Sequence, residues 1–313
     1  MTTSLILLMP PMNKRRVSPY LLLTLSSLFW AGNFVLSKAI STDIQPVTLA
    51  FGRWSLAFLF VLPFAYPHLK KDRIALLRHW KILLPIALLG ISAFNTMIYI
   101  GLQSTTAINS LLLQSFFPVV VPMLAFFFFR EKLTLLQIAG ITVSLLGTLW
   151  LVSQGNPERL LSASLNRGDV WVFAAVVLYA GYALLLRFRP KVHPLSFLAA
   201  TFGLGIVMLL PFWIGELYVY PSPALTVEVG LSFLYLAIFP SLVAYLFFNE
   251  AVGRIGATTA GLFSHLVPTF GSIMAILFLG EDFHSYHAWG ILLIFSGIVL
   301  VVWQTANPAS VKA

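Results

Sequence analysis

Two stretches of this sequence repeat each other at a fixed separation of 150 residues. The first runs from Ala107 to Glu131 and the second from Ala257 to Glu281. Six positions recur unchanged: Ala107, Leu112, Pro118, Ala125, Phe128 and Glu131 correspond to Ala257, Leu262, Pro268, Ala275, Phe278 and Glu281. The offset continues without a gap, since Gly140, Ile141 and Gly147 correspond to Gly290, Ile291 and Gly297. The chain is therefore an internal duplication, and its two halves are expected to share one fold.

The first stretch is also long and apolar enough to cross a membrane. It has 23 residues without a formal charge before Arg130. At 1.5 Å per residue that is about 35 Å of helix, against a bilayer core of about 30 Å. The whole chain is 59% hydrophobic and 9% charged, whereas a soluble domain carries about 25% charged residues. We therefore predict an all-α polytopic membrane protein.

Apolar runs predict ten transmembrane helices. They are expected at residues 19–39, 46–64, 80–102, 107–129, 134–152, 168–187, 195–214, 229–248, 257–279 and 285–304. If the N-terminus is cytoplasmic, 15 of the 19 basic residues fall in inside segments, three (Lys38, Arg159 and Arg167) fall outside, and Arg53 lies within a span. Because cytoplasmic loops collect Lys and Arg, both termini are expected in the cytoplasm. The net charge of +9 is then an orientation signal, and no nucleic-acid partner is expected.

Five spans in each half make the second repeat inverted relative to the first. The expected organisation is a cytoplasmic segment 1–17, a first repeat 18–152, an extracytoplasmic linker 153–167, a second repeat 168–305 and a cytoplasmic tail 306–313. Inverted repeats are typical of secondary transporters, because exchanging the conformations of the two halves opens a central site to each side in turn.

Pro118 and Pro268 stand in the middle of the fourth and ninth spans, where they are predicted to kink the helix and to act in gating. Each removes one backbone N–H, so the carbonyl four residues earlier, at Gln114 or Ser264, loses its partner. An unpaired carbonyl is costly in lipid and must be met by protein, water or ligand. Polar residues flank both kinks, including His265 beside Ser264. This pattern indicates a buried transport site, and the alternative is a kink satisfied by a neighbouring side chain.

Other spans place polar and aromatic side chains at mid-membrane depth. They are Trp30 and Asn33 in the first span, Asn95 and Tyr99 in the third, and Tyr179 and Tyr182 in the sixth. Asn33 should face the bundle interior, because an amide is costly in lipid. Trp30 is too deep to be an interfacial anchor, so a cavity wall is expected. The tyrosines either pack in the core or present hydroxyls to a cavity.

Arg53 lies within the second span, and no acidic residue inside a span is an obvious partner. Its expected partners are helix carbonyls, water or an anionic group of a substrate. The first reading makes Arg53 structural and the last makes it part of a binding site.

His265 is the only histidine in the centre of a span. It can carry protons, donate a hydrogen bond to substrate, or bind a backbone carbonyl, and the sequence leaves these three open. The chain has no cysteine and no Walker A, HExxH or GxSxG motif. We therefore expect no enzyme activity, no cofactor and no metal. Small residues at Gly140, Ser144 and Gly147, and again at Gly290, Ser296 and Gly297, predict close helix packing within the chain or in a homodimer, so the chain is expected to be a monomer or homodimer.

The motifs WAGNF in the first span and FGRW in the second, together with the Ala–Pro–Glu pattern of the duplication, resemble the EamA family of the drug/metabolite transporter superfamily. The resemblance implies an exporter of amino acids, other metabolites or drugs, located in the inner (plasma) membrane with both ends cytoplasmic. It also implies a central cavity lined by spans 1, 3, 4, 6, 8 and 9. The residues that it places in or near that cavity are Trp30, Asn33, Asn95, Tyr99, Gln114, Tyr179, Tyr182, Ser264 and His265.

The function that these observations favour is secondary-active export of a small organic solute, an amino acid or related metabolite, by alternating access. The expected energy source is a proton gradient, a gradient of another solute, or no coupled gradient at all. The alternatives are a drug or nucleotide-sugar carrier of the same fold and, from a different class, a polytopic membrane enzyme. A nucleotide-sugar carrier would need several basic residues in the cavity, whereas a membrane enzyme would need convergent acids or histidines at one depth.

Overall fold

The computed structural model describes residues 17–40, 44–161, 166–220, 226–279 and 282–306. The first repeat comprises α1 (Pro19–Ile40), α2 (Pro46–Arg78), a third span of α3 (Trp80–Ala87), η1 (Leu88–Ala93) and α4 (Phe94–Ser104), a fourth of α5 (Ala107–Gln114) and α6 (Phe117–Phe129), and α7 (Leu135–Val152). The short α8 (Glu158–Leu161) follows. The second repeat comprises α9 (Arg167–Leu185) with η2 (Leu186–Phe188), α10 (Pro194–Val219), an eighth span of α11 (Val227–Leu236), η3 (Ala237–Val243) and α12 (Ala244–Ile255), a ninth of α13 (Ala257–Leu262), η4 (Phe263–His265) and α14 (Leu266–Leu279), and α15 (Ser285–Ala306).

These segments confirm the predicted all-α polytopic architecture. Among the described residues, nine segments are long and apolar enough to cross a membrane, and α1 adds a further helix of 22 residues. The second helix continues 14 residues beyond the predicted span, from residue 64 to Arg78. The added part holds Leu, Lys, Arg and Ala, which favour helix whether or not lipid surrounds them. Glu281 and most of the two terminal segments lie outside the described residues.

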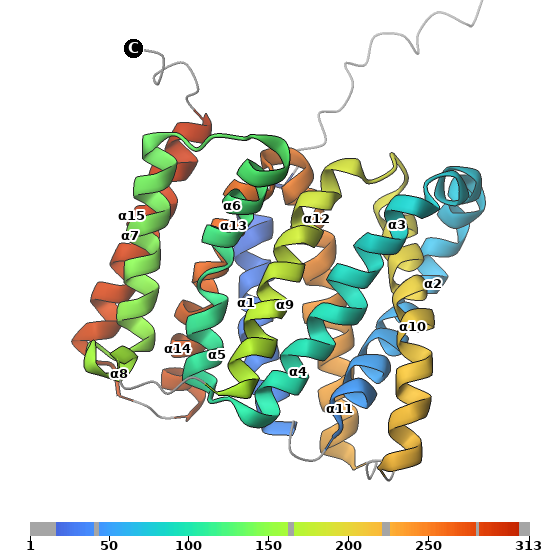
Figure 1. Ribbon diagram of the computed structural model, residues 1–313, viewed down its shortest axis with the longest axis horizontal. Coiled ribbons are helices and arrows are strands. Elements are labelled where there is room, and N and C mark those ends of the chain that lie inside the picture. Colours follow the sequence, from blue (N-terminus) through green and yellow to red (C-terminus); the bar gives the residue numbers. More distant parts are fainter. Residues whose placement is uncertain (1–16, 41–43, 162–165, 221–225, 280–281, 307–313) are drawn as a thin grey trace, which may run out of the picture.

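The two repeats are inverted with respect to each other. In Figure 1, α5 and α6 run upward whereas their counterparts α13 and α14 run downward. Helices α2, α6, α9 and α12 all end at the top of this view, where the basic residues Lys70, Lys71, Arg130, Arg187, Arg189 and Arg254 follow or close them. We call this the basic end.

Each repeat contains a π-helical segment at the same position of the duplication. η1 covers Leu88–Ala93 and η3 covers Ala237–Val243. Such segments leave backbone carbonyls without their usual partner. The Tyr245 hydroxyl donates to the carbonyl of Gly90 at 2.6 Å, and the Trp30 Nε1–H donates to the carbonyl of Pro240 at 3.2 Å. Gly90 and Pro240 are 150 residues apart, so each repeat supplies an aromatic side chain that completes the other.

Helices α7 and α15 pack glycine against glycine. A Cβ atom at Gly297 would lie 2.4 Å from the Gly140 carbonyl oxygen, and one at Gly147 would lie 2.8 Å from the Gly290 carbonyl oxygen. The small-residue pattern of the fifth and tenth spans therefore serves contact within the chain, because only glycine allows the backbones to come this close.

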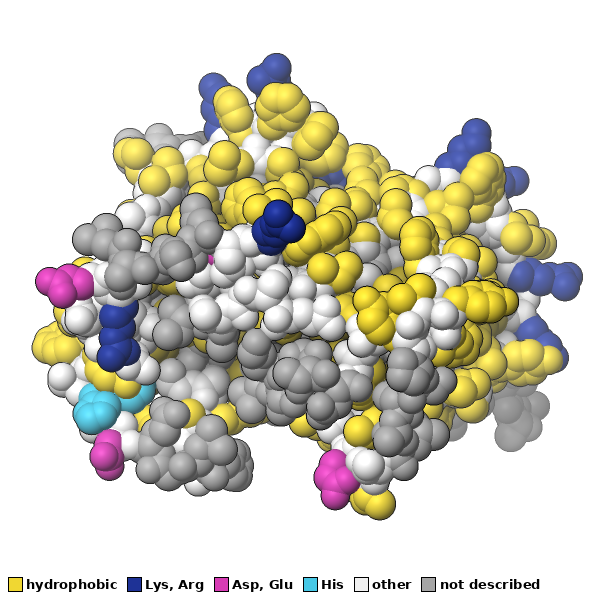
Figure 2. All heavy atoms as spheres, turned by 60° about the horizontal axis from the view of Figure 1, so that its bottom comes forward, with side chains coloured by type: hydrophobic (Ala, Val, Ile, Leu, Met, Phe, Trp, Pro, Cys, Tyr) yellow, Lys and Arg dark blue, Asp and Glu magenta, His cyan; other side chains and the backbone are white. Residues whose placement is uncertain are grey.

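Large apolar side chains cover the flanks of the bundle. Phe64, Phe127, Leu135, Phe212 and Val219 are each more than 65% exposed. Figure 2 shows this apolar flank together with the end opposite the basic end, where acidic and histidine side chains appear beside a few basic ones. An exposed apolar surface of this extent fits a lipid-facing flank and confirms a multi-pass membrane protein.

Candidate functional site

The fourth and ninth spans are both interrupted at the level of the duplicated prolines. The fourth span breaks at Ser115 and Phe116, between α5 and α6. The ninth narrows to the 3₁₀ segment η4. The interruption of the fourth span comes two to three residues before Pro118, and that of the ninth span comes three to five residues before Pro268. At both places the missing proline N–H frees the helical hydrogen-bond ladder.

His265 joins the two interruptions. Its Nε2 lies 2.9 Å from the carbonyl oxygen of Ser115, and its Nδ1 lies 2.6 Å from the hydroxyl of Ser144. A carbonyl only accepts, so Nε2 carries the proton and Nδ1 of the neutral ring accepts from Ser144. The Val119 N–H bonds the Phe116 carbonyl instead, which is why the Ser115 carbonyl needs this partner. His265 is fully buried, with both ring nitrogens occupied.

The ninth span's interruption has a partner from the first helix. The Ser27 hydroxyl donates to the carbonyl of Phe263 at 2.8 Å, and its neighbour Ser26 donates to the carbonyl of Ala244 at 3.1 Å. Helix α1 thus holds both the break in the ninth span and the start of α12, so the elements around the centre are joined by buried polar contacts.

A cavity of about 60 Å³ lies at the centre of the bundle, which is room for a few water molecules. Its wall comes from α1, α2, α4, α5, α6, α9, α12, η4 and α14. The lining residues are Trp30, Asn33, Arg53, Phe94, Asn95, Ile98, Gln114, Phe117, Val176, Tyr179, Tyr245, Ser264 and Val267. A larger solute would require the helices to move apart.

Arg53 is the one formally charged residue among those lining the cavity. It is 1% exposed. Its Nη1 lies within 2.7–2.9 Å of the side-chain oxygens of Asn33, Asn95 and Tyr99, and its Nε donates to the Ser241 hydroxyl at 2.5 Å. The recorded partners are therefore neutral side-chain oxygens and not the helix carbonyls favoured by the sequence. In the described part of the chain, no carboxylate lies within 4.0 Å of Arg53.

Tyr179 is the centre of an aromatic cluster. Its ring centroid lies 4.4 Å from that of Phe94, 5.4 Å from Phe117 and 5.9 Å from Trp30. Tyr182 stacks against it one turn further along α9, at 5.2 Å. These rings give the cavity apolar walls of fixed shape, because they brace one another.

Three buried polar atoms on the cavity residues make no hydrogen bond of ordinary length to any residue that the structure describes. They are Asn95 Nδ2, the Tyr179 hydroxyl and the Ser264 hydroxyl. Buried polar atoms are ordinarily satisfied, and exceptions call for a ligand, water or functional reason. All three can donate a hydrogen bond, so the cavity is rich in donors.

Six of the nine residues expected in the cavity are among its lining: Trp30, Asn33, Asn95, Gln114, Tyr179 and Ser264. The other three lie behind the wall. Tyr99 binds Arg53, Tyr182 donates to Asn249, and His265 binds Ser115 and Ser144. Sequence reasoning left out Phe94, Phe117 and Tyr245. The duplication could have identified Tyr245, since it corresponds to Asn95 at the 150-residue offset.

A larger hollow of about 580 Å³ opens at the basic end. We call it the vestibule. Three chain segments line both the cavity and the vestibule. Tyr179, Phe117 and Ser264 line the cavity, and on the same three segments Ala183, Pro122 and Thr259, respectively, line the vestibule. Four or five residues of helix separate the two sets, which is about 6–8 Å. Only this thickness of protein closes the cavity from the vestibule.

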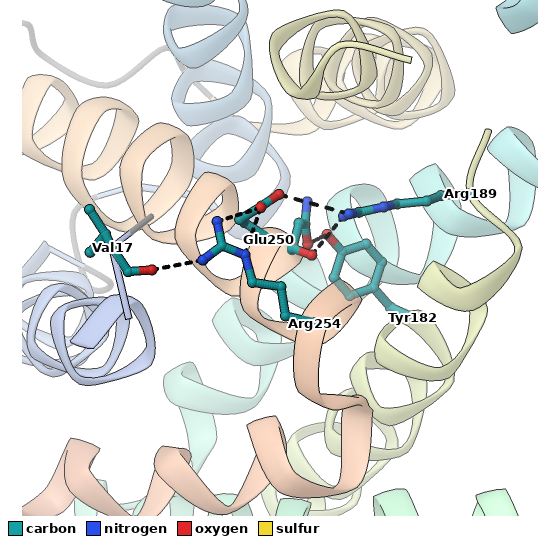
Figure 3. Close-up of polar contacts among 6 residues, drawn as sticks. Val17, Tyr182, Arg189, Glu250 and Arg254 are labelled. Carbon is teal, nitrogen blue, oxygen red and sulfur yellow. Dashed lines mark hydrogen bonds and ion pairs between the residues drawn. The ribbon is translucent and has the colours of Figure 1, made fainter. Parts of the chain in front are cut away.

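A polar network braces this closure at the basic end (Figure 3). Tyr182 donates to the side chain of Asn249 at 2.6 Å, and Arg189 donates to the Asn249 carbonyl at 2.6 Å. Arg254 pairs with Glu250 at 2.7 Å and donates to the carbonyl of Val17 at 2.7 Å. The network ties α9, α12 and the start of α1 together beside the vestibule.

Comparison with known proteins decides the family. The profile of the EamA-like transporter family matches residues 17–153 and again 166–303. The chain belongs to the EamA-like transporter family. The two matches follow the duplication, so each half of the chain is one EamA unit.

The relatives of this EamA chain are named as transporters. It is 27% identical to the uncharacterized transporter YyaM of Bacillus subtilis, over 91% of this chain and 93% of that protein. It is 26% identical to an S-adenosylmethionine/S-adenosylhomocysteine transporter of Chlamydia trachomatis, over 84% of this chain and 82% of that protein. A solved crystal structure superposes with a TM-score of 0.74 at 16% identity, over 92% of this chain and 98% of the other. That last likeness shows the fold.

Proposed function

We propose that this protein is a secondary-active exporter of a small organic solute, an amino acid or related metabolite, which works by alternating access. The observation that carries the proposal is the arrangement of the two hollows. A polar and aromatic cavity lies where two interrupted helices of opposite orientation meet, and about 6–8 Å of protein divides it from the vestibule. The interrupted helices are the elements that can bend, with Pro118 and Pro268 as the gating residues.

In this proposal the protein lies in the inner membrane with the basic end and both termini in the cytoplasm. The solute enters the cavity from the vestibule and leaves at the opposite end. The basic end carries most of the described Lys and Arg side chains, which supports this orientation. Reporters fused after Ala313 and inserted near Lys71 should read as cytoplasmic, and one near Asn156 as external. An external reading at Lys71 would refute the inverted arrangement in the membrane.

The function is tested by an untargeted comparison of metabolites in the medium of cells that express the protein and cells that do not. A blocked variant, Val176→Trp, is the matched control, because Val176 lines the cavity and an indole would fill it. We expect one or a few solutes to accumulate only with the unmodified protein. Identical media from all three strains would contradict the proposal, provided that the protein is folded in the membrane fraction.

The relative described as an S-adenosylmethionine/S-adenosylhomocysteine transporter supports widening the comparison to nucleoside-bearing amino acids. The rings of Trp30, Phe94 and Tyr179 around the cavity could stack on a purine. The proposal assigns the protein no enzymatic reaction and no cofactor.

A further inference from the structure

The charges along the route between the two hollows have one dominant sign. Among the described residues, the cavity lining contains Arg53 and no acid. The vestibule lining contains four basic residues and one acid: Lys132, Arg187, Arg189, Lys191 and Glu131. We infer that, among amino acids and related metabolites, the exported solute is an organic anion with a net negative charge, held by its carboxylate or a similar group at Arg53, and that the membrane potential alone drives its exit. This inference rests on the proposed export function and adds the substrate class and the driving force.

The first step of the argument is the state of Arg53. A buried charge is stable only when it is paired and hydrogen-bonded, and its recorded partners are neutral oxygens. The guanidinium also lies 5.0 Å from the ring centre of Trp54, a favourable contact that adds no opposite charge. An anion in the cavity supplies the missing charge, and a guanidinium fork matches a planar carboxylate.

The second step is the set of unsatisfied donors. Asn95 Nδ2 can only donate, and the hydroxyls of Tyr179 and Ser264 can donate. All three atoms are buried and make no hydrogen bond of ordinary length to a described residue. The Tyr245 hydroxyl is a nearby protein acceptor for Asn95 and Tyr179, and it already donates to the Gly90 carbonyl. An acceptor-rich group such as a carboxylate satisfies such donors better than an ammonium, which itself only donates. The rings around Tyr179 then contact the apolar part of the solute.

The third step is the vestibule. Arg187 pairs with Glu131, and the remaining basic residues leave its lining with a net positive charge. Lys132 and Lys191 are exposed. A charged mouth raises the local concentration of ions of opposite sign, and salt screens the effect.

The fourth step is energetic. With the basic end in the cytoplasm, the interior-negative potential pushes an anion outward, by about 50-fold in concentration ratio per 100 mV for a single charge. Outward movement of an anion therefore needs no coupled proton. The titratable groups around the cavity agree with this: the Tyr179 and Tyr245 rings are packed in the aromatic cluster, the Tyr99 hydroxyl binds Arg53, the Tyr182 hydroxyl binds Asn249, and both nitrogens of His265 are occupied.

The site is tested with three probes that share one ring: benzoate, benzylammonium and benzyl alcohol, each titrated into purified full-length protein at pH 7.5 by calorimetry. We expect benzoate to bind at least about tenfold more tightly than the other two. Arg53→Gln should remove that preference while leaving benzyl alcohol unchanged, and Arg53→Lys should keep part of it. If Arg53 is purely structural, Arg53→Gln will weaken the binding of all three probes together. Equal or tighter binding of the cation or the alcohol would overturn the inference, as would no binding of benzoate.

Two further measurements do not depend on the folding of Arg53→Gln. The exported solute found in the metabolite comparison is loaded into proteoliposomes. Its efflux should accelerate when valinomycin and a potassium gradient make the lumen negative, and a pH gradient at zero potential should change nothing. The double variant Lys132→Gln, Lys191→Gln should slow efflux about two- to tenfold at 20 mM salt, with no difference at 500 mM. Efflux driven by the pH gradient but not by the potential would overturn the inference. If the comparison finds no exported solute, the export function fails, whereas the benzoate titration still decides the anion site.

Discussion

The two repeats share their backbone interruptions but differ in the side chains that they bring to the centre. The π segments η1 and η3, the breaks before Pro118 and Pro268, and the glycine contacts of α7 and α15 all recur at the 150-residue offset. The cavity chemistry does not recur. The first repeat supplies Arg53 with its amide partners, and Gly203 stands at the corresponding position of the second.

The second repeat contributes hydroxyl groups instead, from Tyr179, Tyr245 and Ser264, whereas aromatic rings come from both repeats. This difference indicates that the backbone and the cavity wall meet separate requirements. Exchange between two conformations needs matching helix interruptions in both halves, whereas orienting a solute with unlike ends needs a cavity whose two sides differ in chemistry. Substitutions at paired positions can therefore test which features are symmetric.

The largest effect is expected at the glycine contacts, where the repeats should respond alike. Gly297→Val and Gly147→Val each place side-chain atoms against backbone, at 2.4 Å and 2.8 Å from a facing carbonyl oxygen for the Cβ alone. Backbone cannot move aside as a flexible side chain can, so we expect a loss of more than about 3 kcal/mol for each. Thermal unfolding in detergent measures this. Gly215→Val is the control, because nothing lies within 4 Å of its Cβ position, and a large loss at only one contact would refute the symmetry.

The second-largest loss of stability should be confined to the second repeat, because the residue that corresponds to His265 in the first repeat is Ser115. His265→Phe leaves the Ser115 carbonyl and the Ser144 hydroxyl without partners, and each buried unsatisfied group costs about 1–3 kcal/mol. We expect a total of about 2–4 kcal/mol, and about half of that for His265→Gln, whose amide can donate and accept. Ser264→Ala is the neighbouring control and should change the unfolding free energy by less than about 0.5 kcal/mol. Equal losses for His265→Phe and Ser264→Ala would show that the imidazole bridge contributes nothing.

A smaller and reciprocal effect is expected where each repeat completes the other's π segment. Tyr245→Phe removes the donor to the Gly90 carbonyl, and Trp30→Phe removes the donor to the Pro240 carbonyl. Each should cost about 1–2 kcal/mol in thermal unfolding. Tyr218→Phe, at a residue that is 88% exposed, should be neutral. A loss in one variant only would mean that one π segment is satisfied by other means.

The smallest effect on stability is expected for Tyr179→Phe. Its hydroxyl makes no hydrogen bond of ordinary length to a described residue, so the unfolding free energy should change by less than about 0.5 kcal/mol. Benzoate affinity should nevertheless fall about ten- to a hundredfold, which is the range of one hydrogen bond to a charged group. A stability loss of several kcal/mol with unchanged affinity would assign the hydroxyl to the fold and not to the site.

The spans and the inversion could be predicted because both depend on local features of the sequence, namely apolar runs, charged loops and repeated residues. Hydrophobic length marks each span, and the repeated Pro118 and Pro268 mark the helix interruptions. The π segments were not predictable, since Gly90 and Pro240 are different residue types and the duplication shows no insertion there. The partners of Arg53 were also missed. They come from three different helical segments, up to 188 residues away, and no local pattern encodes such a meeting.

The bond between His265 and Ser115 joins two residues that are 150 positions apart, so it links equivalent points of the two repeats across their pseudo-two-fold axis. In a pair of identical five-span chains, any residue on that axis would meet its own copy, and two imidazoles would compete for one space. An imidazole donor from one repeat, His265, and a carbonyl acceptor from the other, Ser115, require that the two repeats differ in sequence at this position. This contact could therefore become fixed only once both copies had diverged, and fusion into one gene, which keeps unlike halves together, is the history that it favours.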